Sequence, residues 1–422
     1  MKKILLCFLC FCSLISVNAD SSVQARIGNR FFDTLEEAIA NATSNDIISL
    51  TSDVSLSKGL EINKNVNINL NNHTIETDSK VFLVQGGSLN VSGTGTIREK
   101  KPYYGAVVLI GSDNPNDVDY STVSIGENVT LEGWSGIFID HDNKNSYGVL
   151  VNMNGKINAV SDTNGDSGVG VYVNGYIKHL DNAPIINLGK TAKIKSDGVG
   201  IYSAGFSRYY VNGAWIEGVE AGLGIKSGTV KILDGTILGT GEDKTPTTGN
   251  NDGINPSGAA IQIESNNSYI GNIELDIRGG TIKSIKSYAI YEYTVGSANT
   301  KIKTISLSGG TYLAKSDYPV LKMSDSFNGV HTGFISGGLY SSSPSSYLED
   351  GYSSKENGDS LYEVVNKDMS SEKKLQTNNE QDNKKRNNNW IYYSIAITIF
   401  VTLSILIYLN FSDILRFLGI SR

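Results

Sequence analysis

The sequence predicts an all-β protein in which short parallel strands stack in successive coils, a β-solenoid. The strongest observation is an internal repeat, because residues 274–293 and residues 304–323 align without a gap. Repeats of about 20–50 residues indicate stacked units, each of which buries its apolar face against its neighbours. The matched pairs include Gly280 and Gly310, Thr281 and Thr311, and Tyr288 and Tyr318.

The second observation is a rhythm of apolar residues at every other position, in short segments separated by glycine, asparagine and serine. Such segments are typical of strands with one buried face. The separating residues favour turns, because glycine adopts positive φ without steric cost. We therefore expect the repeated glycine to form a corner, the threonine to begin the next strand and the tyrosine to begin a third face. Examples of the alternation are residues 104–110, 169–173, 199–203 and 258–263.

A β-propeller is the alternative architecture, but each of its blades needs about 40 residues and four antiparallel strands. The segments here recur after roughly 25–30 residues, which fits a parallel solenoid better. Residues 47–365 are therefore assigned to the solenoid, with about eleven coils of roughly 28 residues each.

Residues 20–46 precede the solenoid and are expected to form an N-terminal cap. Within them, residues 33–42 predict an amphipathic helix whose apolar side includes Leu35 and Ile39. Thr34 and Glu37 have the spacing of a capping box. We expect this helix to lie across the first coil, where it would cover strands otherwise open to edge-to-edge association.

Residues 1–19 have the pattern of a secretory signal peptide: Lys2 and Lys3, then an apolar run, then small residues before a cleavage site after Ala19. An uncleaved anchor is the alternative, although the run is short for a bilayer. All three cysteines lie in this segment, so we expect the mature protein to have no disulfide, thiolate metal site or catalytic thiol.

The C-terminal part of the sequence predicts a membrane anchor. Residues 366–389 form a polar segment that we expect to be a disordered linker. Residues 390–409 carry no charge, are bordered by aromatic residues and match the thickness of a bilayer, which favours a transmembrane helix over a buried core helix. Residues 410–422 would form a cytoplasmic tail. The lysines before the span oppose the positive-inside tendency, but a long domain is translocated largely regardless of charge.

Three segments carry a family resemblance: residues 27–54 (IGNRFFDTLEEAIANATSNDIISLTSDV), residues 65–75 (NVNINLNNHTI) and residues 334–365 (FISGGLYSSSPSSYLEDGYSSKENGDSLYEVV). In these segments the sequence resembles bacterial cell-surface proteins with the pectin-lyase-like right-handed parallel β-helix. The resemblance covers about residues 25–365 and implies a right-handed coil and export. It implies no particular activity, because this fold carries enzymes, adhesins and inert stalks. The chain lacks the Leu-Pro-x-Thr-Gly sorting signal of many wall-attached members.

Catalytic candidates are few. Asp140 and Asp142 are two positions apart, so in an extended segment they would face the same side at about the separation of an inverting glycosidase pair. The double-aspartate and Gly-His-Gly signatures of hydrolases with this fold are absent, and a solvated turn after a strand is the simpler interpretation.

One segment has the spacing of a calcium loop. Asp162, Asn164 and Asp166 stand at alternate positions, as oxygen ligands do in such a loop. However, Ser167 stands where glycine is expected, and Val173 stands where a bidentate glutamate is expected. An ordinary Asn/Asp turn is therefore the alternative, and no cofactor is predicted.

Binding is better supported by the residues. Arg208, Tyr209, Tyr210 and Trp215 gather in a short segment, and exposed aromatic faces suit sugar rings or flat protein surfaces. The alternative is that these rings pack beneath turns. If Tyr209 and Tyr210 lie on a strand, their side chains alternate, so one of them should point outward.

The net charge of −7 argues against nucleic acid as a partner. The sequence therefore predicts a monomeric, single-pass protein of the cell membrane whose large extracellular domain binds a glycan or a surface protein. A carbohydrate-active enzyme, either a polysaccharide lyase or a glycoside hydrolase, remains an alternative. A structural stalk without a ligand is another.

Overall fold

The computed structural model describes residues 23–140, 145–174, 177, 180–245, 255–298 and 300–368. The chain divides into two compact units. The first contains the residues up to Glu349 together with Ser354–Val364, and the second contains Asp350–Ser353 and the residues from Val365 onward. The repeated strands all belong to the first unit, which therefore carries the candidate sites.

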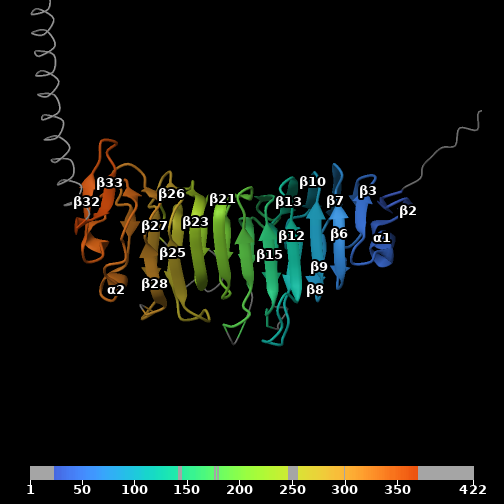
Figure 1. Ribbon diagram of the computed structural model, residues 1–422, viewed down its shortest axis with the longest axis horizontal. Helices are drawn as coiled ribbons and strands as arrows, with labels where there is room; N and C mark the ends of the chain where they lie inside the picture. Colours follow the sequence, from blue (N-terminus) through green and yellow to red (C-terminus); the bar gives the residue numbers. More distant parts are fainter. Residues whose placement is uncertain are drawn as a thin grey trace, which may run out of the picture. The chain divides into compact units, whose positions relative to one another are not determined.

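The first unit is built from three ladders of parallel strands (Figure 1). The first ladder contains β3 (Ile47–Leu50), β6 (Asn65–Asn69), β9 (Ser88–Ser92), β12 (Ser121–Ile125), β15 (Val149–Met153), β18 (Ile185–Leu188), β21 (Arg208–Gly218), β23 (Gly228–Gly239), β25 (Ile273–Ile277) and β28 (Ile302–Leu307). The second ladder contains β4 (Val54–Ser55), β7 (His73–Thr77), β10 (Gly95–Glu99), β13 (Val129–Gly133), β16 (Lys156–Ala159), β19 (Lys193–Ser196), the second halves of β21 and β23, β26 (Thr281–Ser284), β29 (Thr311–Leu313) and β31 (Leu339–Tyr340). The third ladder contains β5 (Leu60–Ile62), β8 (Phe82–Gln85), β11 (Val107–Ile110), β14 (Ser135–Asp140), β17 (Val169–Val173), β20 (Val199–Ser203), β22 (Ala221–Ile225), β24 (Ala259–Ser265), β27 (Ile290–Thr294) and β30 (Leu321–Lys322).

In each coil the chain passes through the first, second and third ladders in turn, and each strand pairs in parallel with its equivalent in the next coil. The third ladder has ten strands, so ten coils are complete, close to the eleven expected from the repeat length. β31 continues the second ladder beyond the tenth coil. The predicted all-β fold with stacked parallel strands is confirmed at this level.

The repeat in the sequence corresponds to two stacked coils. Thr281 begins β26 and lies in register with Thr311, which begins β29. The preceding Gly280 and Gly310 have φ of +83° and +91°, a conformation that favours glycine at this corner. The alignment slips by one residue in the third ladder, because Ile290 pairs with Leu321 rather than with Val320. The gapless alignment therefore describes two ladders of the coil correctly and the third incorrectly.

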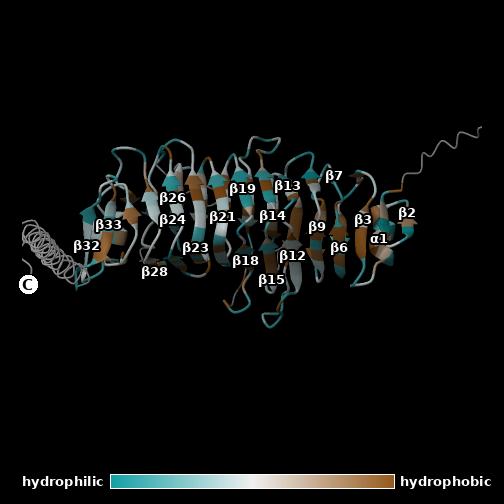
Figure 2. Cartoon of the chain, turned by 45° about the horizontal axis from the view of Figure 1, so that its top comes forward, coloured by the Kyte–Doolittle hydropathy of each residue, from teal (hydrophilic) through white to brown (hydrophobic). Residues whose placement is uncertain are grey.

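The interior of the coils is apolar, and equivalent residues stack on one another. Along the first ladder, Val66, Leu89 and Val123 are fully buried and lie in register. Apolar and polar residues alternate along many strands, as the colouring of Figure 2 shows. One aromatic stack continues this pattern in the second ladder, where the rings of Tyr312 and Tyr340 lie 4.6 Å apart and nearly parallel. Stacking of like residues in successive coils is what the repeated alternation predicts.

The first coil is preceded by β1 (Ala25–Ile27), β2 (Arg30–Phe32) and α1 (Leu35–Asn41). β1 pairs antiparallel with both β2 and β3. The Thr34 hydroxyl accepts a hydrogen bond from the Glu37 backbone N–H, and Leu35 is fully buried. The helix is shorter than the predicted residues 33–42, since it begins at Leu35 and ends at Asn41.

After the tenth coil come α2 (Asp325–Asn328), the 3₁₀ turn η1 (Ser345–Tyr347), β32 (Tyr352–Glu356) and β33 (Tyr362–Asn366). β33 pairs antiparallel with β31. None of the helices within the described residues is long and apolar enough to cross a membrane. The predicted signal peptide (residues 1–19), most of the predicted linker and the predicted transmembrane segment (residues 390–409) lie outside the described residues.

Candidate functional site

The outer face of the third ladder differs from the other outer faces because most of its side chains from β11 to β27 are buried. On a strand with one solvent-exposed face, alternate residues point to water. Along β11, β20, β22, β24 and β27 the outward positions are also covered, so that these strands have two buried faces. Buried outward residues include Val108, Phe138, Tyr202, Gln262 and Tyr291, none of which is more than 8% exposed.

Aromatic rings form a continuous strip on this face. Phe138, Tyr172 and Tyr202 lie in register on β14, β17 and β20. The ring centroids of Phe138 and Tyr172 are 4.8 Å apart, and those of Tyr172 and Tyr202 are 5.2 Å apart. Trp134 packs against Phe138 and Tyr172 from the corner before β14. Such contacts stabilise the fold beyond the burial of their area.

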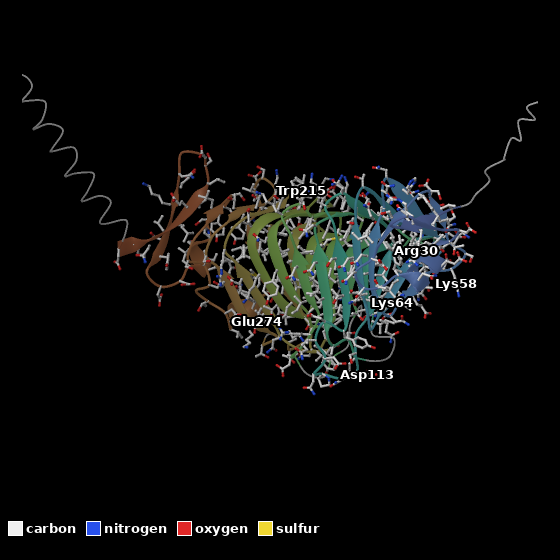
Figure 3. All side chains as sticks on the ribbon, turned by 45° about the vertical axis from the view of Figure 1, so that its right-hand side comes forward. Arg30, Lys58, Lys64, Asp113, Trp215 and Glu274 are labelled. Atoms are coloured by element: carbon white, nitrogen blue, oxygen red, sulfur yellow. The ribbon has the colours of Figure 1, made fainter. Side chains whose placement is uncertain are left out.

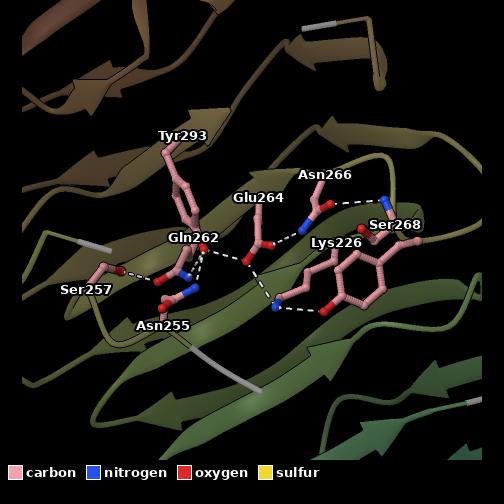
Figure 4. A network of polar contacts seen from close by, with 9 residues as sticks. Lys226, Asn255, Ser257, Gln262, Glu264, Asn266, Ser268 and Tyr293 are labelled. Atoms are coloured by element: carbon pink, nitrogen blue, oxygen red, sulfur yellow. Dashed lines mark hydrogen bonds and ion pairs between the residues drawn. The ribbon is translucent and has the colours of Figure 1, made fainter. Parts of the chain in front are cut away.

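A buried network of polar groups continues the strip along the third ladder (Figure 4). The Lys226 Nζ lies 3.0 Å from a carboxylate oxygen of Glu264, and each side chain is only 2% exposed. The ammonium also donates to the Tyr269 hydroxyl at 3.0 Å. The Tyr293 hydroxyl donates to the same Glu264 oxygen at 2.5 Å, and the Asn266 amide donates to the other at 2.8 Å. The buried carboxylate is therefore paired with a cation and with two hydrogen-bond donors, as burial of a charge requires.

Tyr293 links this ion pair to a second group of residues. Its hydroxyl accepts a hydrogen bond from the Asn255 amide at 3.1 Å and from the Gln262 amide at 3.5 Å. The Ser257 hydroxyl donates to the Gln262 oxygen. Burial, and next the Glu264 carboxylate, raise the pKa of Tyr293, so the phenol stays protonated at neutral pH. The network thus joins residues 255–257 and 266–269 to Lys226, which follows β22, and to β24 and β27.

Of the two catalytic candidates, the structure describes Asp140. Asp140 ends β14 and lies in register with Ile110 on the third ladder. Asp142 lies outside the described residues, so the separation of the two carboxyl groups stays a prediction.

The calcium candidates form a turn. One carboxylate oxygen of Asp162 accepts hydrogen bonds from the backbone N–H groups of Asn164 and Asp166, each at 2.8 Å. The other accepts from the Asn164 amide at 3.2 Å. These contacts are those of an Asx turn, the alternative that the sequence left open. Within the described part of the chain, no group of three or more His, Cys, Asp or Glu residues could hold a metal ion.

The four binding candidates all lie on β21 but point in different directions. Tyr209 points into the coil and is 1% exposed, whereas Tyr210 points outward and is 37% exposed. One of the twin tyrosines therefore points outward, as expected. Trp215 follows the corner at Gly213 and is 42% exposed on the second ladder (Figure 3). Arg208 lies on the first ladder and donates to the Leu180 carbonyl oxygen at 2.5 Å.

Tyr209 is suited to packing rather than to ligand contact. Its hydroxyl is buried and has no hydrogen-bond partner among the described residues. Burial raises the pKa of Tyr209 to about 12, while the nearby Ser203 and Ser207 hydroxyls act in the opposite direction. Tyr209 lies in register with the buried Ile186 of the coil before it, so it occupies a position in the interior stack.

The outer face of the first ladder carries a row of amide and hydroxyl groups that the sequence interpretation missed. The Asn90 amide donates to the Asn67 oxygen at 3.0 Å, and the Asn187 amide donates to the Asn152 oxygen at 2.9 Å. Ser124 lies between these pairs in register. The sequence signal was asparagine at the polar positions of the alternation in successive coils.

Comparison of the chain with protein-family models, with curated proteins and with solved structures found no match. The structure alone therefore defines the class of protein, a β-solenoid of parallel strands with one largely covered ladder and two open ladders.

Proposed function

We propose that this chain is a surface-displayed binding protein, held in the cell membrane by residues 390–409, that binds a glycan or a surface protein. The observation that carries the proposal is the pair of exposed rings, Tyr210 and Trp215, on the outer faces of one strand. An aromatic ring that stays exposed on a sheet offers a flat apolar surface beside polar neighbours, which suits sugar rings and protein surfaces.

The titratable groups of the covered face support binding more than catalysis. Lys226, Glu264 and Tyr293 have the chemistry of acid–base groups, but they are paired with one another and are at most 7% exposed. A general acid or base needs a proton-transfer path to a substrate within hydrogen-bond reach. In this proposal the network holds residues 255–257 and 266–269 on the third ladder.

The remaining parts of the proposal concern display. The signal peptide at residues 1–19 directs residues 20–389 outside the cell, and residues 410–422 stay in the cytoplasm. The coil winds right-handedly, as in the proteins that the sequence resembles. α1 acts as a lid, and the support for this is that it contacts β1, β2 and β3, while the Lys64 ammonium donates to the carbonyl groups of Ala40 and Ala42 at its C-terminal end.

Incubation of the full-length protein with a panel of polysaccharides, scored for both retention and cleavage, tests this proposal. We expect retention of at least one polymer without cleavage, and we expect Tyr210→Ala combined with Trp215→Ala to reduce it about tenfold. Phe31→Ala is the matched control, because Phe31 is 63% exposed but lies on β2. Asp140→Asn should leave retention unchanged.

Two outcomes would contradict the proposal. Cleavage that disappears in Asp140→Asn would assign the chain to the carbohydrate-active enzymes, because an acid–base group acts mainly in the transition state. Failure to retain any glycan or surface protein would favour the structural stalk.

A further inference from the structure

The outer face of the second ladder carries a basic row that ends in a tryptophan. Lys156, Lys193 and Trp215 stand on β16, β19 and β21 and lie in register with one another. Adjacent parallel strands lie about 4.8 Å apart, so the three side chains follow the stacking direction at a spacing comparable with the length of one sugar unit. Lys195 stands beside this row on β19. We call Lys156, Lys193, Lys195 and Trp215 the Trp215 patch.

Only part of the charge of the Trp215 patch is balanced by a described carboxylate. Lys195 lies 3.4 Å from Glu217, but Lys156 and Lys193 are exposed and make no ion pair with a described residue. Two coils earlier on the same ladder the situation differs, because Arg98 lies between Glu76 and Glu132 and forms ion pairs with both. The chain as a whole carries a charge of −7, so the basic row stands out from its own surroundings.

The ring of Trp215 is held in place by its neighbours. The indole N–H donates to a Glu217 carboxylate oxygen at 3.2 Å. Glu217 in turn pairs with Lys195 of the preceding coil. An exposed side chain that is fixed before binding loses less conformational entropy when it meets a ligand. Figure 3 shows Trp215 at the edge of the molecule, away from the interior of the coil.

We propose that the Trp215 patch binds a linear anionic polysaccharide along the stacking direction, with one sugar ring on Trp215 and acidic substituents on Lys156 and Lys193. This inference rests on the proposed function and narrows its ligand class from glycans in general to acidic glycans. Lysine supplies a point charge for a carboxylate or sulfate group, and the indole face supplies the surface on which a sugar ring stacks.

Nucleic acid, the other polymer that combines negative charge with flat rings, fits less well. Its backbone carries a closely spaced series of phosphates, and binding it requires an extended basic surface. Beyond the patch, the outward row of the second ladder continues with Thr236 and Thr281 on one side and Thr130 on the other. A short basic row on an acidic chain therefore favours a polymer with sparser charge.

The test is the binding of the full-length chain to three polymers: polygalacturonate, which has charge and sugar rings, dextran, which has rings alone, and poly-L-glutamate, which has charge alone. We expect tight binding to polygalacturonate only, weakened by added salt because the charges are exposed. Lys156→Gln combined with Lys193→Gln should weaken binding about fivefold, and Trp215→Ala about tenfold. Lys58→Gln combined with Lys283→Gln is the matched control, since both lysines are exposed and lie outside the patch.

The outcomes separate this inference from the proposed function. Equal binding of dextran, or full binding by the patch variants, would overturn the inference while glycan binding itself stands. Equal binding of poly-L-glutamate would show that the patch attracts any negatively charged polymer, and this result would also overturn the inference. If polygalacturonate does not bind but another glycan of the panel is retained through Tyr210, the inferred ligand class is wrong and the proposed function still stands.

Discussion

Two lysine–glutamate pairs on neighbouring coils differ in burial, because one lies on an open face of the solenoid and the other lies on its covered face. Lys195 and Glu217 lie 3.4 Å apart on the open second ladder, where the lysine side chain is 71% exposed. Lys226 and Glu264 lie 3.0 Å apart on the covered third ladder, where each side chain is 2% exposed. Both pairs join neighbouring parallel coils, so we attribute the difference to the segments that lie over the third ladder.

The comparison indicates that the segments connecting the strands, rather than the strands of the coil, decide which outward side chains of this fold are buried. An exposed ion pair contributes little because water screens it and its long side chains lose freedom. A buried pair has already lost its hydration, so removal of one partner leaves an uncompensated charge. The side chains of the covered face are therefore suited to stabilising the fold, whereas those of the open faces stay accessible to a ligand.

The largest effect is expected from breaking the covered pair. Lys226→Met leaves the buried Glu264 carboxylate without its cation and should lower the free energy of unfolding by about 3–5 kcal/mol. Lys195→Met, the same substitution on the open ladder, should cost less than about 1 kcal/mol. Chemical denaturation of the two variants beside the parent protein measures both values. Similar losses for the two variants would show that the two faces do not differ as described.

A second buried lysine, which directly precedes β28, gives a pH-dependent comparison. Lys301 is 5% exposed, and its ammonium donates to the Tyr269 carbonyl oxygen. Burial lowers the pKa of Lys301 to about 8. In the unfolded chain the lysine titrates near its usual value of 10.5, so between these values the unfolded state binds one more proton and stability rises with pH.

We expect the free energy of unfolding to rise by roughly 1–2 kcal/mol between pH 8 and pH 10 because of Lys301, an amount reduced for residual solvation. Lys301→Met should remove this rise. Above about pH 10 the sign reverses, because the pKa values of buried tyrosines such as Tyr209 and Tyr293 are raised and the unfolded state loses its phenolic protons first. Denaturation curves at several pH values measure the slope. A parent protein whose stability is flat or falling from pH 8 to pH 10 would contradict the assignment to Lys301.

The strands of the open ladders could be predicted from the sequence, because the alternation of apolar and polar residues is a local pattern. Alternation at period two identified the strands, and it placed Tyr209 and Tyr210 on opposite sides of β21. The positive-φ glycines marked the corners, as at Gly280 and Gly310. The one-residue slip between Ile290 and Leu321 was not visible, because a corner can absorb a residue without changing either strand.

The covered ladder was less accessible to sequence reasoning. Residues 107–110 and 135–139 are nearly continuous apolar runs, a pattern typical of strands buried on both faces. The alternation rule predicts one buried face for them, whereas the structure covers both faces of β11 and most of β14. The network could not have been found from spacing, because Lys226 meets Glu264 and Tyr269 from 38 and 43 residues away. Gln262 and Glu264, polar residues at alternate positions of one such strand, were the available signal.

The central claim is that the open second ladder meets the ligand at Trp215. The sequence contains three tryptophans, so Trp134→Phe combined with Trp390→Phe leaves Trp215 as the only tryptophan of the full-length chain. The most direct measurement is its fluorescence during titration with polygalacturonate. We predict a saturable change in emission that is reversed by salt and absent with dextran, because the sugar ring covers the indole only when the lysines hold the acidic chain. An emission that stays unchanged while the polymer is bound would place the ligand elsewhere and would contradict the claim.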